Sequence, residues 1–154
     1  MRVDGLLFRE ARFEDLPAIV HVFMGDVEGG HGDLWSEETR PAYEEAMRRL
    51  QASAANTLFV AEIGGAVIGT MQVTIIPGLV SRGRTRAKFE SVHIRPEWRG
   101  KGIGEAMIRH GVAFAREQGA EVVELSSNKK RLAAHRFYER LGFSRSHEGF
   151  KLLL

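Results

Sequence analysis

The stretch "RPEWRGKGIGEA", residues 95–106, lies where an apolar run gives way to a helical pattern, and it places three glycines among two arginines, a lysine and two glutamates. The preceding segment, "RAKFESVHI" at 86–94, predicts a strand that ends before Pro96, because proline has no N–H to continue a ladder. The following residues, 102–118, predict a helix with one apolar stripe formed by Ile103, Ala106, Met107, Gly111, Phe114 and Ala115. A strand, a glycine turn and a helix therefore form the centre of the predicted fold.

The glycine turn has the features of an anion cradle. Two better-known phosphate loops do not fit: no Gly-Lys-Ser/Thr ending surrounds Lys101, and the third glycine of a dinucleotide fingerprint would fall on Glu105 or Met107. The first N–H groups of a helix and its dipole attract anions, and glycine lets the main chain approach a ligand closely. We expect a pyrophosphate here, although the spacing alone also suits a plain strand-to-helix turn.

The rest of the chain predicts a mixed α/β sheet with helices on its faces. Helices are expected at 13–24, with Asp15 as N-terminal cap, at 36–53, with a fresh start or a kink at Pro41, and at 131–143, where Gly142 ends the helix. Strands are expected at 6–12, 57–63, 66–76 and 121–127, with a hairpin turn at Gly64-Gly65. The ending "FSRSHEGFKLLL", 143–154, predicts a last hairpin.

Length and composition favour one domain over residues 1–154. Hydrophobic residues make up 44% of the chain, and no apolar run approaches the roughly 20 residues that a bilayer requires. The N-terminal segment lacks the pattern of a signal peptide, so a cytoplasmic location without membrane contact is expected. The absence of cysteine excludes disulfides, thiolate metal sites and a cysteine nucleophile.

Charge and histidine spacing argue against nucleic acid and metal. The net charge is only +2, and the basic cluster at 81–88 has no interleaved aromatic residues, so a solvated loop is favoured over a nucleic-acid module. The six histidines include no HExxH pair, and no metal is expected. The segment "GDVEGGHGD", with Asp26, Glu28, His31 and Asp33, is interpreted as a solvated loop that shapes an acceptor pocket; attraction of a cationic substrate or weak metal binding is the alternative.

A second motif lies downstream in "SSNKKRLAAHRFYERLGF", residues 126–143, which places Asn128 after a strand and Tyr138 in a helix. Together with the glycine stretch, these residues resemble the GCN5-related N-acetyltransferase (GNAT) superfamily over residues 87–143. The resemblance implies an acyl-CoA N-acyltransferase fold, with a central, mostly antiparallel twisted sheet and about four flanking helices. It also implies acetyl-CoA as co-substrate and an amine as acceptor. The segment 124–152 looks like aminoalkylphosphonate and, more loosely, aminoglycoside 6'-N-acetyltransferases, which favours a small primary amine.

The resemblance also assigns cofactor contacts. The main chain of Val92, His93 and Ile94 would bind the pantetheine arm as an added strand does. The pyrophosphate would lie on the glycine stretch, at Arg99, Gly100, Lys101, Gly102, Ile103 and Gly104. Asn128 and Arg131 would reach the cofactor arm or its phosphates. His135 would line the same channel, with a packing role as the equal alternative.

Acetyl transfer from a thioester to an amine involves two proton transfers, one from the attacking amine and one to the leaving thiolate. At pH 7 only about one part in two thousand of a lysine-like amine is neutral, and the leaving thiolate departs more readily when an acid meets it. The resemblance gives Tyr138 as general acid, against the alternative of a core tyrosine beside Phe137 and Leu141. Glu90 would bind the amine or act as a water-relayed base, against the alternative of an exposed strand glutamate.

Strict strand alternation bears on which side chains near Glu90 can cooperate. It places Glu90 on the same face as Val92 and Ile94, and His93 on the opposite face. We therefore expect that Glu90 and His93 do not act as a pair.

The sequence predicts direct transfer without a covalent enzyme intermediate, because it contains no serine or cysteine nucleophile motif. A protein or peptide acceptor is the first alternative. A non-catalytic acyl-CoA sensor is the second, and the presence of Tyr138 disfavours it. Either a monomer or a homodimer fits this interpretation.

Overall fold

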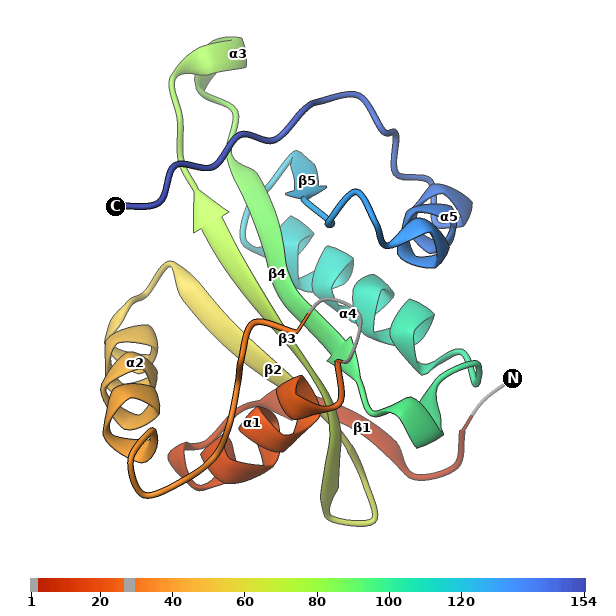
Figure 1. Cartoon of the computed structure of the whole chain (residues 1–154). Coiled ribbons are helices and arrows are strands. Elements are labelled where there is room, and N and C mark those ends of the chain that lie inside the picture. Colours follow the sequence, from red (N-terminus) through yellow and green to blue (C-terminus); the bar gives the residue numbers. More distant parts are fainter. Residues whose placement is uncertain (1–2, 27–29) are drawn as a thin grey trace.

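The computed structural model describes residues 3–26 and 30–154. Their centre is a five-stranded sheet in the order β1-β2-β3-β4-β5 (Figure 1). The first four strands pair antiparallel, and β5 pairs parallel to β4. The bounds are Leu6–Glu10 for β1, Asn56–Ile63 for β2, Ala66–Ile76 for β3, Arg86–Ile94 for β4 and Val122–Leu125 for β5. The predicted mixed, mostly antiparallel sheet is confirmed.

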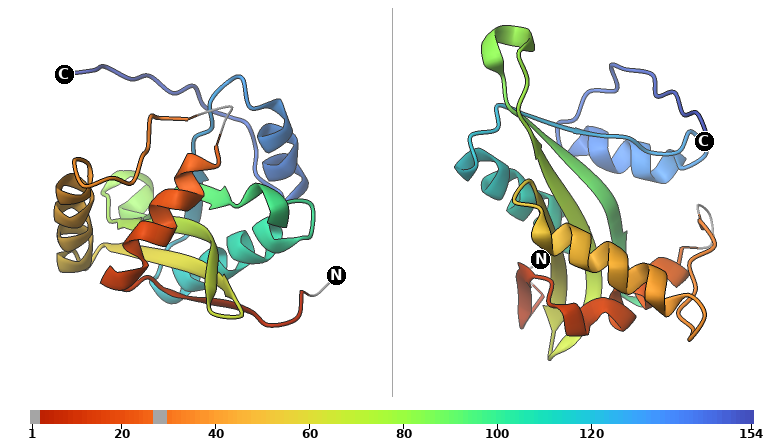
Figure 2. Two further views of the ribbon diagram at one scale, coloured as in Figure 1. Left: turned by 60° about the horizontal axis from the view of Figure 1, so that its bottom comes forward. Right: turned by 90° about the vertical axis from the view of Figure 1, so that its left-hand side faces the viewer.

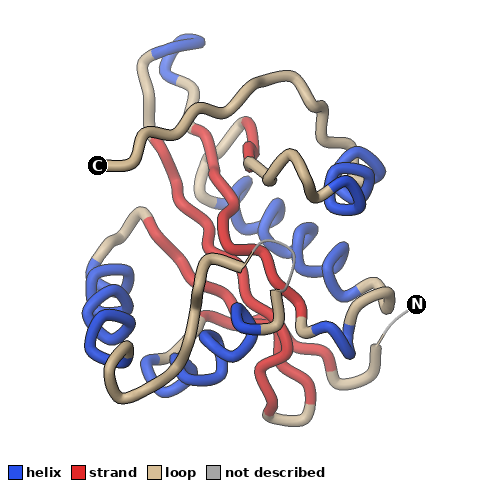
Figure 3. The backbone as a smooth tube through the Cα atoms, viewed as in Figure 1, coloured by secondary structure: helices blue, strands red, loops and turns tan. Residues whose placement is uncertain are grey.

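The helices cover both faces of this sheet (Figures 1 and 2). Helices α1, Leu16–Met24, and α2, Arg40–Ala52, lie on one face, and α4, Ile103–Glu117, lies on the other. The shorter helices are α3, Val80–Gly83, and α5, Leu132–Arg140. Figure 3 shows how much of the chain between these elements is loop. Within the described ranges no helix is long and apolar enough to span a bilayer.

The main core lies between the sheet and α4. Ile103, Met107 and Ile108 of the helix are almost fully buried against a sheet face that includes Met71 and Phe89. On the other face α1 forms smaller clusters with β2 and β3. The stripe predicted from helical spacing is therefore the stripe that α4 buries, because i, i+3 and i+4 positions share one side of a helix.

Two predicted helix starts differ in detail from the structure. A 3-10 turn, Phe13–Asp15, precedes α1, so Asp15 holds the N-cap position, but its carboxylate does not cap α1. It accepts hydrogen bonds from the Arg9 guanidinium at 2.7 and 2.9 Å and from the Arg12 N–H at 2.7 Å instead, because a charged partner from β1 lies within reach. Helix α2 begins at Arg40, close to the predicted fresh start at Pro41.

The predicted hairpin at 143–154 is wrong, because this segment forms no strand. Its first half, 144–149, is polar, and only residues 150–154 carry an apolar run. Two strands of this composition would share no apolar face, and an isolated hairpin without one is marginal in water.

In the basic cluster at 81–88, residues 81–84 are exposed, residues 85–88 are half-buried or buried, and two arginines form ion pairs. It contains α3, a single helical turn, in which Ser81 and Arg82 have φ of 58° and 62°. Arg84 lies 3.6 Å from Glu121, and Arg86 donates to Glu124 at 2.8 Å. The exposure of residues 81–84 agrees with the interpretation as a solvated loop.

Gly111 of α4 allows close packing against the sheet, and its replacement should destabilise the protein. A Cβ at this position would lie 2.6 Å from Met71 Cε and 2.9 Å from Phe89 Cζ. We expect Gly111→Val to lower the free energy of unfolding by about 1–3 kcal/mol, the usual cost of overpacking. Urea denaturation measures this, with Ala113→Val on the exposed side of α4 as control. A Gly111→Val variant as stable as the control would contradict the packing argument.

Candidate active site

Strands β4 and β5 separate towards one end of the sheet and leave an open main-chain edge. They pair only from Arg86↔Val122 to Phe89↔Leu125, where β5 ends. Strand β4 continues to Ile94 with β3 as its strand partner. On its other side, residues 90–94 have no neighbouring strand within the described chain. The main chain predicted to bind an extended ligand arm, Val92–Ile94, lies on this edge.

A β-bulge at Ser91 changes which side chains face together. Gln72 of β3 pairs with Glu90 and Thr70 with His93, so β4 advances three residues where β3 advances two. Ser91 has φ of 51°, in the left-handed region that a non-glycine residue seldom adopts. Glu90 and His93 therefore share one face, while Val92 and Ile94 turn towards the core on the α4 side. The prediction that Glu90 and His93 lie on opposite faces is wrong.

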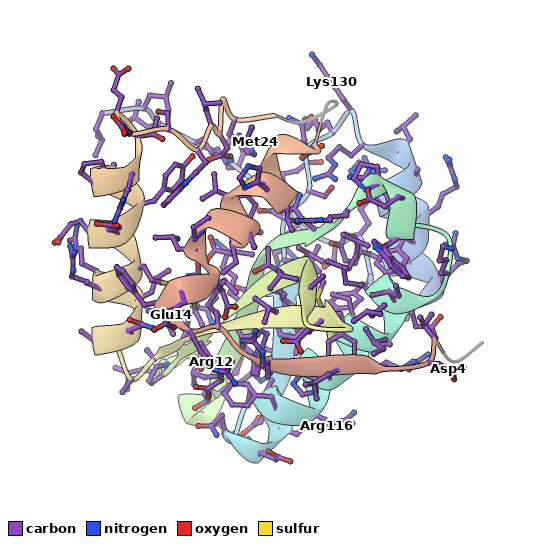
Figure 4. All side chains as sticks on the ribbon, turned by 90° about the horizontal axis from the view of Figure 1, so that it is seen from below. Asp4, Arg12, Glu14, Met24, Arg116 and Lys130 are labelled. Carbon is purple, nitrogen blue, oxygen red and sulfur yellow. The ribbon has the colours of Figure 1, made fainter. Side chains whose placement is uncertain are left out.

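The His93 side chain lies in a buried polar cluster formed by three elements. Its Nδ1 is 3.7 Å from Asp26 Oδ2, just beyond α1, and its ring meets that of Phe23 edge-on at 5.3 Å. Arg131 Nη1, just before α5, lies 3.8 Å from the same Asp26 oxygen. Figure 4 shows Met24 of α1 and Lys130 at the same side of the molecule. The bulge thus turns His93 towards the place where α1, β4 and the start of α5 meet.

Burial keeps the His93 imidazole neutral. Desolvation lowers its pKa from 6.5, which Asp26 opposes, while Arg131, Arg99 and His31 lower it further. A neutral imidazole can accept a proton, so His93 has the chemistry of a base as well as a position on the Glu90 face.

The depressed pKa of His93 predicts a pH dependence of stability. Because the folded-state pKa lies below 6.5, the unfolded chain binds more protons below that pH, and the free energy of unfolding falls as the pH falls. We expect His93→Gln to flatten this dependence in urea denaturation between pH 7.5 and 5. Burial lowers the pKa of His110 as well, so part of the slope should stay. His147→Gln, in the exposed tail, is the control, and an unchanged slope in His93→Gln would contradict the assignment.

At the start of α4, the glycine stretch has backbone N–H groups that find no hydrogen-bond acceptor in the described chain. Gly100 and Gly102 have φ of 73° and 78°, and Gly102 is the N-cap residue. No side chain caps the helix, and its first intrahelical bond runs from the Ala106 N–H to the Gly102 carbonyl. The side chain of Ile103 is 1% exposed, so this residue offers a ligand only its main chain. The amides of the first turn and the helix dipole can therefore hold an anion.

Two basic side chains of this stretch, Arg99 and Lys101, contact other groups of the protein. Arg99 Nε donates to the Ile94 carbonyl at 3.0 Å, which ties the loop to the end of β4. The Lys101 ammonium lies 5.4 Å from the ring centre of Trp98. A surface hollow of about 450 Å³, lined by residues 3–6 and the start of α4, adjoins Lys101.

Gly104 has a packing role in addition to its place in the stretch. A Cβ there would lie 3.4 Å from Phe137 Cζ, so α4 and α5 approach each other at this glycine. This contact brings the first turn of α4 close to the helix that carries Tyr138.

The turn between β5 and α5 is built around Asn128. Its Oδ1 accepts from the Lys130 N–H at 3.0 Å, and its carbonyl accepts from the Arg131 N–H at 3.0 Å and from His135 Nε2 at 2.9 Å. Because Nε2 is the donor, His135 Nδ1 is a bare acceptor. The sequence placed Asn128 and His135 at the cofactor, and the structure also gives both a role in holding the turn.

Two buried polar atoms beside this turn have no partner in the described chain. They are His135 Nδ1 and Ser127 Oγ. Buried polar groups are normally hydrogen-bonded, so a ligand with amide and hydroxyl groups, such as a pantetheine arm, suits this place. Ser127 was not among the predicted site residues, and its only signal was its position at the end of the predicted strand 121–127, directly before Asn128.

Tyr138 on α5 faces the same core region. Its ring packs against Phe137 at 5.1 Å and Phe143 at 5.7 Å, which agrees with the alternative of a packed tyrosine. Its hydroxyl makes no hydrogen bond among the described residues, and burial raises its pKa above 10.0 against the opposing effect of Arg131. The side chain is thus a protonated donor whose hydroxyl is free to serve a ligand.

Glu90 and the acidic residues of the segment at 25–33 differ in whether their carboxylates have partners. Glu90 is exposed and forms no ion pair within the described ranges. Asp33 accepts from the Tyr43 hydroxyl at 2.6 Å, whereas Asp26 belongs to the His93 cluster. Glu28 lies outside the described residues. Among those that are described, no group of three His, Asp or Glu side chains is placed to hold a metal.

Comparison with known proteins identifies the family of this chain. The model of the acetyltransferase (GNAT) family matches residues 27–143. A glucosamine 6-phosphate N-acetyltransferase of Trypanosoma brucei brucei is 35% identical over 102 residues, 66% of each chain. An aminoalkylphosphonate N-acetyltransferase of Salmonella typhimurium is 41% identical over 63 residues, 41% of each chain. The chain thus spans two thirds or less of these curated relatives.

Solved structures show the same fold over nearly the whole chain. A protein of Bacillus halodurans, described as a transcriptional regulator, superposes with a TM-score of 0.92 and 35% identity, covering 97% of this chain and 99% of that one. A putative acetyltransferase of Agrobacterium tumefaciens gives 0.83 and 26%, covering 96% and 99%. A predicted acetyltransferase of Clostridium acetobutylicum, solved with acetyl-CoA, gives 0.74 and 18% over 96% of each chain, and shows the fold alone. The splayed strands and the glycine stretch before α4 agree with the family match over residues 27–143, which shows that this chain belongs to the acetyltransferase (GNAT) family.

Proposed function

We propose that the protein transfers the acetyl group of acetyl-CoA directly to the primary amine of a small molecule. The observation that carries this proposal is the open edge of β4 at residues 90–94, and the uncapped start of α4 and the protonated Tyr138 hydroxyl support it. The relatives named for glucosamine 6-phosphate and aminoalkylphosphonate support a small amine as acceptor.

The donor would lie along the open edge. The main-chain groups of Val92–Ile94 would bind its extended arm as a neighbouring strand would. The amides from Gly100 to Gly104 would bind its pyrophosphate, and Lys101 would add positive charge. The free polar atoms of Ser127 and His135 support a polar arm beside the β5–α5 turn.

In the proposed reaction, one group would take a proton from the amine on one side of the thioester, and another would give a proton to the thiolate on the other side. Glu90 would bind the incoming ammonium or take its proton through water, and neutral His93 lies on the same face to assist. The amine nitrogen would attack the thioester carbonyl, the C–S bond would break, and Tyr138 would protonate the departing thiolate. At pH 7 a lysine-like acceptor is almost fully protonated, and obtaining its neutral, nucleophilic form costs about 4 kcal/mol. A group that takes up the proton from the bound amine offsets this cost.

A thiol-release screen tests the proposed function. Purified protein and acetyl-CoA are incubated with amines, aminophosphonates, amino sugars, aminoglycosides, polyamines and peptides, and free CoA thiol is measured. We expect release that depends on a small primary amine. Release with peptides alone would indicate a protein acceptor, and acetyl-CoA binding without release against every class would indicate a sensor.

A further inference from the structure

Next to Glu90, the sheet carries a hydrogen-bonded group of polar side chains that no step of the proposed reaction uses. Gln72 of β3 pairs with Glu90 of β4, and Asn56 of β2 pairs with Thr74 of β3. Paired residues share a face and side chains alternate along each strand, so these four lie on the face away from α4, whereas Phe89 lies in the core beneath that helix. Glu90 is exposed, and Figure 1 shows no helix in front of the middle of β4. A ligand can therefore reach the group from this side.

Asn56 sets the direction of the Gln72 amide. The Asn56 Nδ2 donates to Ser53 Oγ at 2.9 Å, and its Oδ1 accepts from Thr74 Oγ1 at 2.7 Å and from Gln72 Nε2 at 3.2 Å. Only the NH2 end of the Gln72 amide can approach Oδ1, because its carbonyl end would place two acceptor oxygens together without a proton between them. Within the described ranges the Gln72 Oε1 accepts no hydrogen bond. The network thus holds Gln72 in one orientation and leaves its carbonyl oxygen available.

The available oxygen lies on the Glu90 side of β3. Strands β2 and β4 flank β3, so the end of the amide that does not bond to β2 is the end nearer to Glu90. The Cβ atoms of directly paired residues are about 5 Å apart, which lets the Gln72 and Glu90 side chains contact one small group together.

The charge of Glu90 is also available. Lys88 lies two residues earlier on the same face, and neither of the two forms an ion pair in the part of the chain that the structure describes. Glu124, which pairs with Lys88 across β4 and β5, bonds to Arg86 instead. A primary ammonium has three N–H donors, so a carboxylate that binds one of them leaves two without a protein acceptor.

We propose that Gln72 binds the acceptor amine together with Glu90. The Gln72 Oε1 accepts one N–H of the ammonium while the Glu90 carboxylate accepts another, and the third N–H can pass its proton on before the nitrogen attacks. Asn56 is the positioning residue that keeps Oε1 available. This role rests on the proposed function, and it adds to Glu90 a second, uncharged ligand for a primary amine that arrives protonated.

Gln72→Met tests this role, because methionine has nearly the same length and lacks the carbonyl oxygen. Thiol release is measured with the amine of the screen that reacts fastest, and acetyl-CoA affinity by isothermal titration calorimetry. We expect KM for the amine to rise about tenfold or more, as loss of a hydrogen bond to a charged group does. The kcat should stay within about threefold and the acetyl-CoA affinity should not change, since the lost contact is made before and during the reaction alike. Gln118→Met, at the exposed end of α4, is the matched control and should keep the wild-type KM.

Double variants test the positioning role of Asn56. Asn56→Leu removes the acceptor for Gln72 Nε2 and should raise KM in the wild type, but should add nothing in Gln72→Met, because Asn56 acts through Gln72. Asn56→Asp keeps an oxygen for Nε2 and should restore KM to within about threefold of the wild type. An equal rise of KM from Asn56→Leu in both backgrounds would show that Asn56 only supports the sheet.

A binding measurement separates this role from the proposed function. The dissociation constant of butylammonium for the complex of the protein with CoA is measured by saturation-transfer difference NMR, with 1-butanol as the neutral counterpart. We expect the ammonium to bind more tightly than the alcohol, and Gln72→Met to weaken it about tenfold. This result would support the site even if no amine released thiol, in which case the proposed transfer alone would have failed. An unchanged KM or dissociation constant in Gln72→Met, or a loss of acetyl-CoA affinity in that variant, would overturn the inference, and so would butylammonium that binds no better than 1-butanol.

Discussion

Replacing Tyr138 with phenylalanine is expected to lower kcat roughly 100-fold or more, the usual contribution of a positioned general acid. The change removes only the hydroxyl, while the ring contacts with Phe137 and Phe143 are kept, so the fold should be preserved. Because burial raises the pKa of Tyr138, the wild-type hydroxyl stays protonated up to at least pH 9, and the loss should hold across pH 6 to 9. Steady-state thiol release measures the effect.

Tyr43→Phe is the control for the loss of a tyrosine hydroxyl, because the chain contains two tyrosines and this one lies on α2, where it donates to Asp33. Its kcat should stay close to that of the wild type. If Tyr138→Phe also kept full kcat, Tyr138 would be a packing residue and the thiolate would have to leave without it.

Replacing Gly100 with alanine is expected to weaken acetyl-CoA binding at least tenfold. Gly100 has φ of 73°, and a Cβ built there meets no protein atom within 4 Å, so the methyl group would project into the space offered to the pyrophosphate. Tenfold corresponds to about 1.4 kcal/mol of binding free energy, which the loss of close main-chain contacts readily accounts for. Isothermal titration calorimetry measures the affinity.

Gly119→Ala at the other end of α4 is the matched control for this change. Gly119 also has a positive φ, 84°, and also has open space around its Cβ position. Both variants therefore carry the same left-handed strain of about 1–2 kcal/mol, but only one touches the proposed anion site. Equal affinities in the two variants would show that the glycine stretch is a turn and not a cradle.

The sequence predicted the parts of the fold that local pattern determines. The apolar stripe of α4 and the alternation in the first half of β4, residues 86–90, have strong periods, and both elements were predicted from them. The glycine stretch was placed correctly between a strand and a helix for the same reason. These features needed no knowledge of distant contacts.

The parts that local pattern does not determine were missed or misassigned. The bulge depends on Ser91 adopting a positive φ, which serine does not signal, and one extra residue reverses the facing of His93. The cluster of Asp26, His93 and Arg131 joins three elements far apart in the chain. The hairpin at 143–154 was wrong because the apolar run at 150–154 suggested a strand, whereas the polar residues 144–149 provide no second apolar strand to pair with it.

Mass spectrometry of a complete reaction tests whether the acetyl group passes directly from acetyl-CoA to the amine. Acetyl-CoA with a labelled acetyl group is incubated with the protein and the best amine from the screen, and both the products and the intact protein are weighed. We expect one labelled N-acetyl amine for each CoA released and a protein of unchanged mass. A labelled protein that passes its acetyl group on, or CoA release without an acetylated amine, would contradict direct transfer.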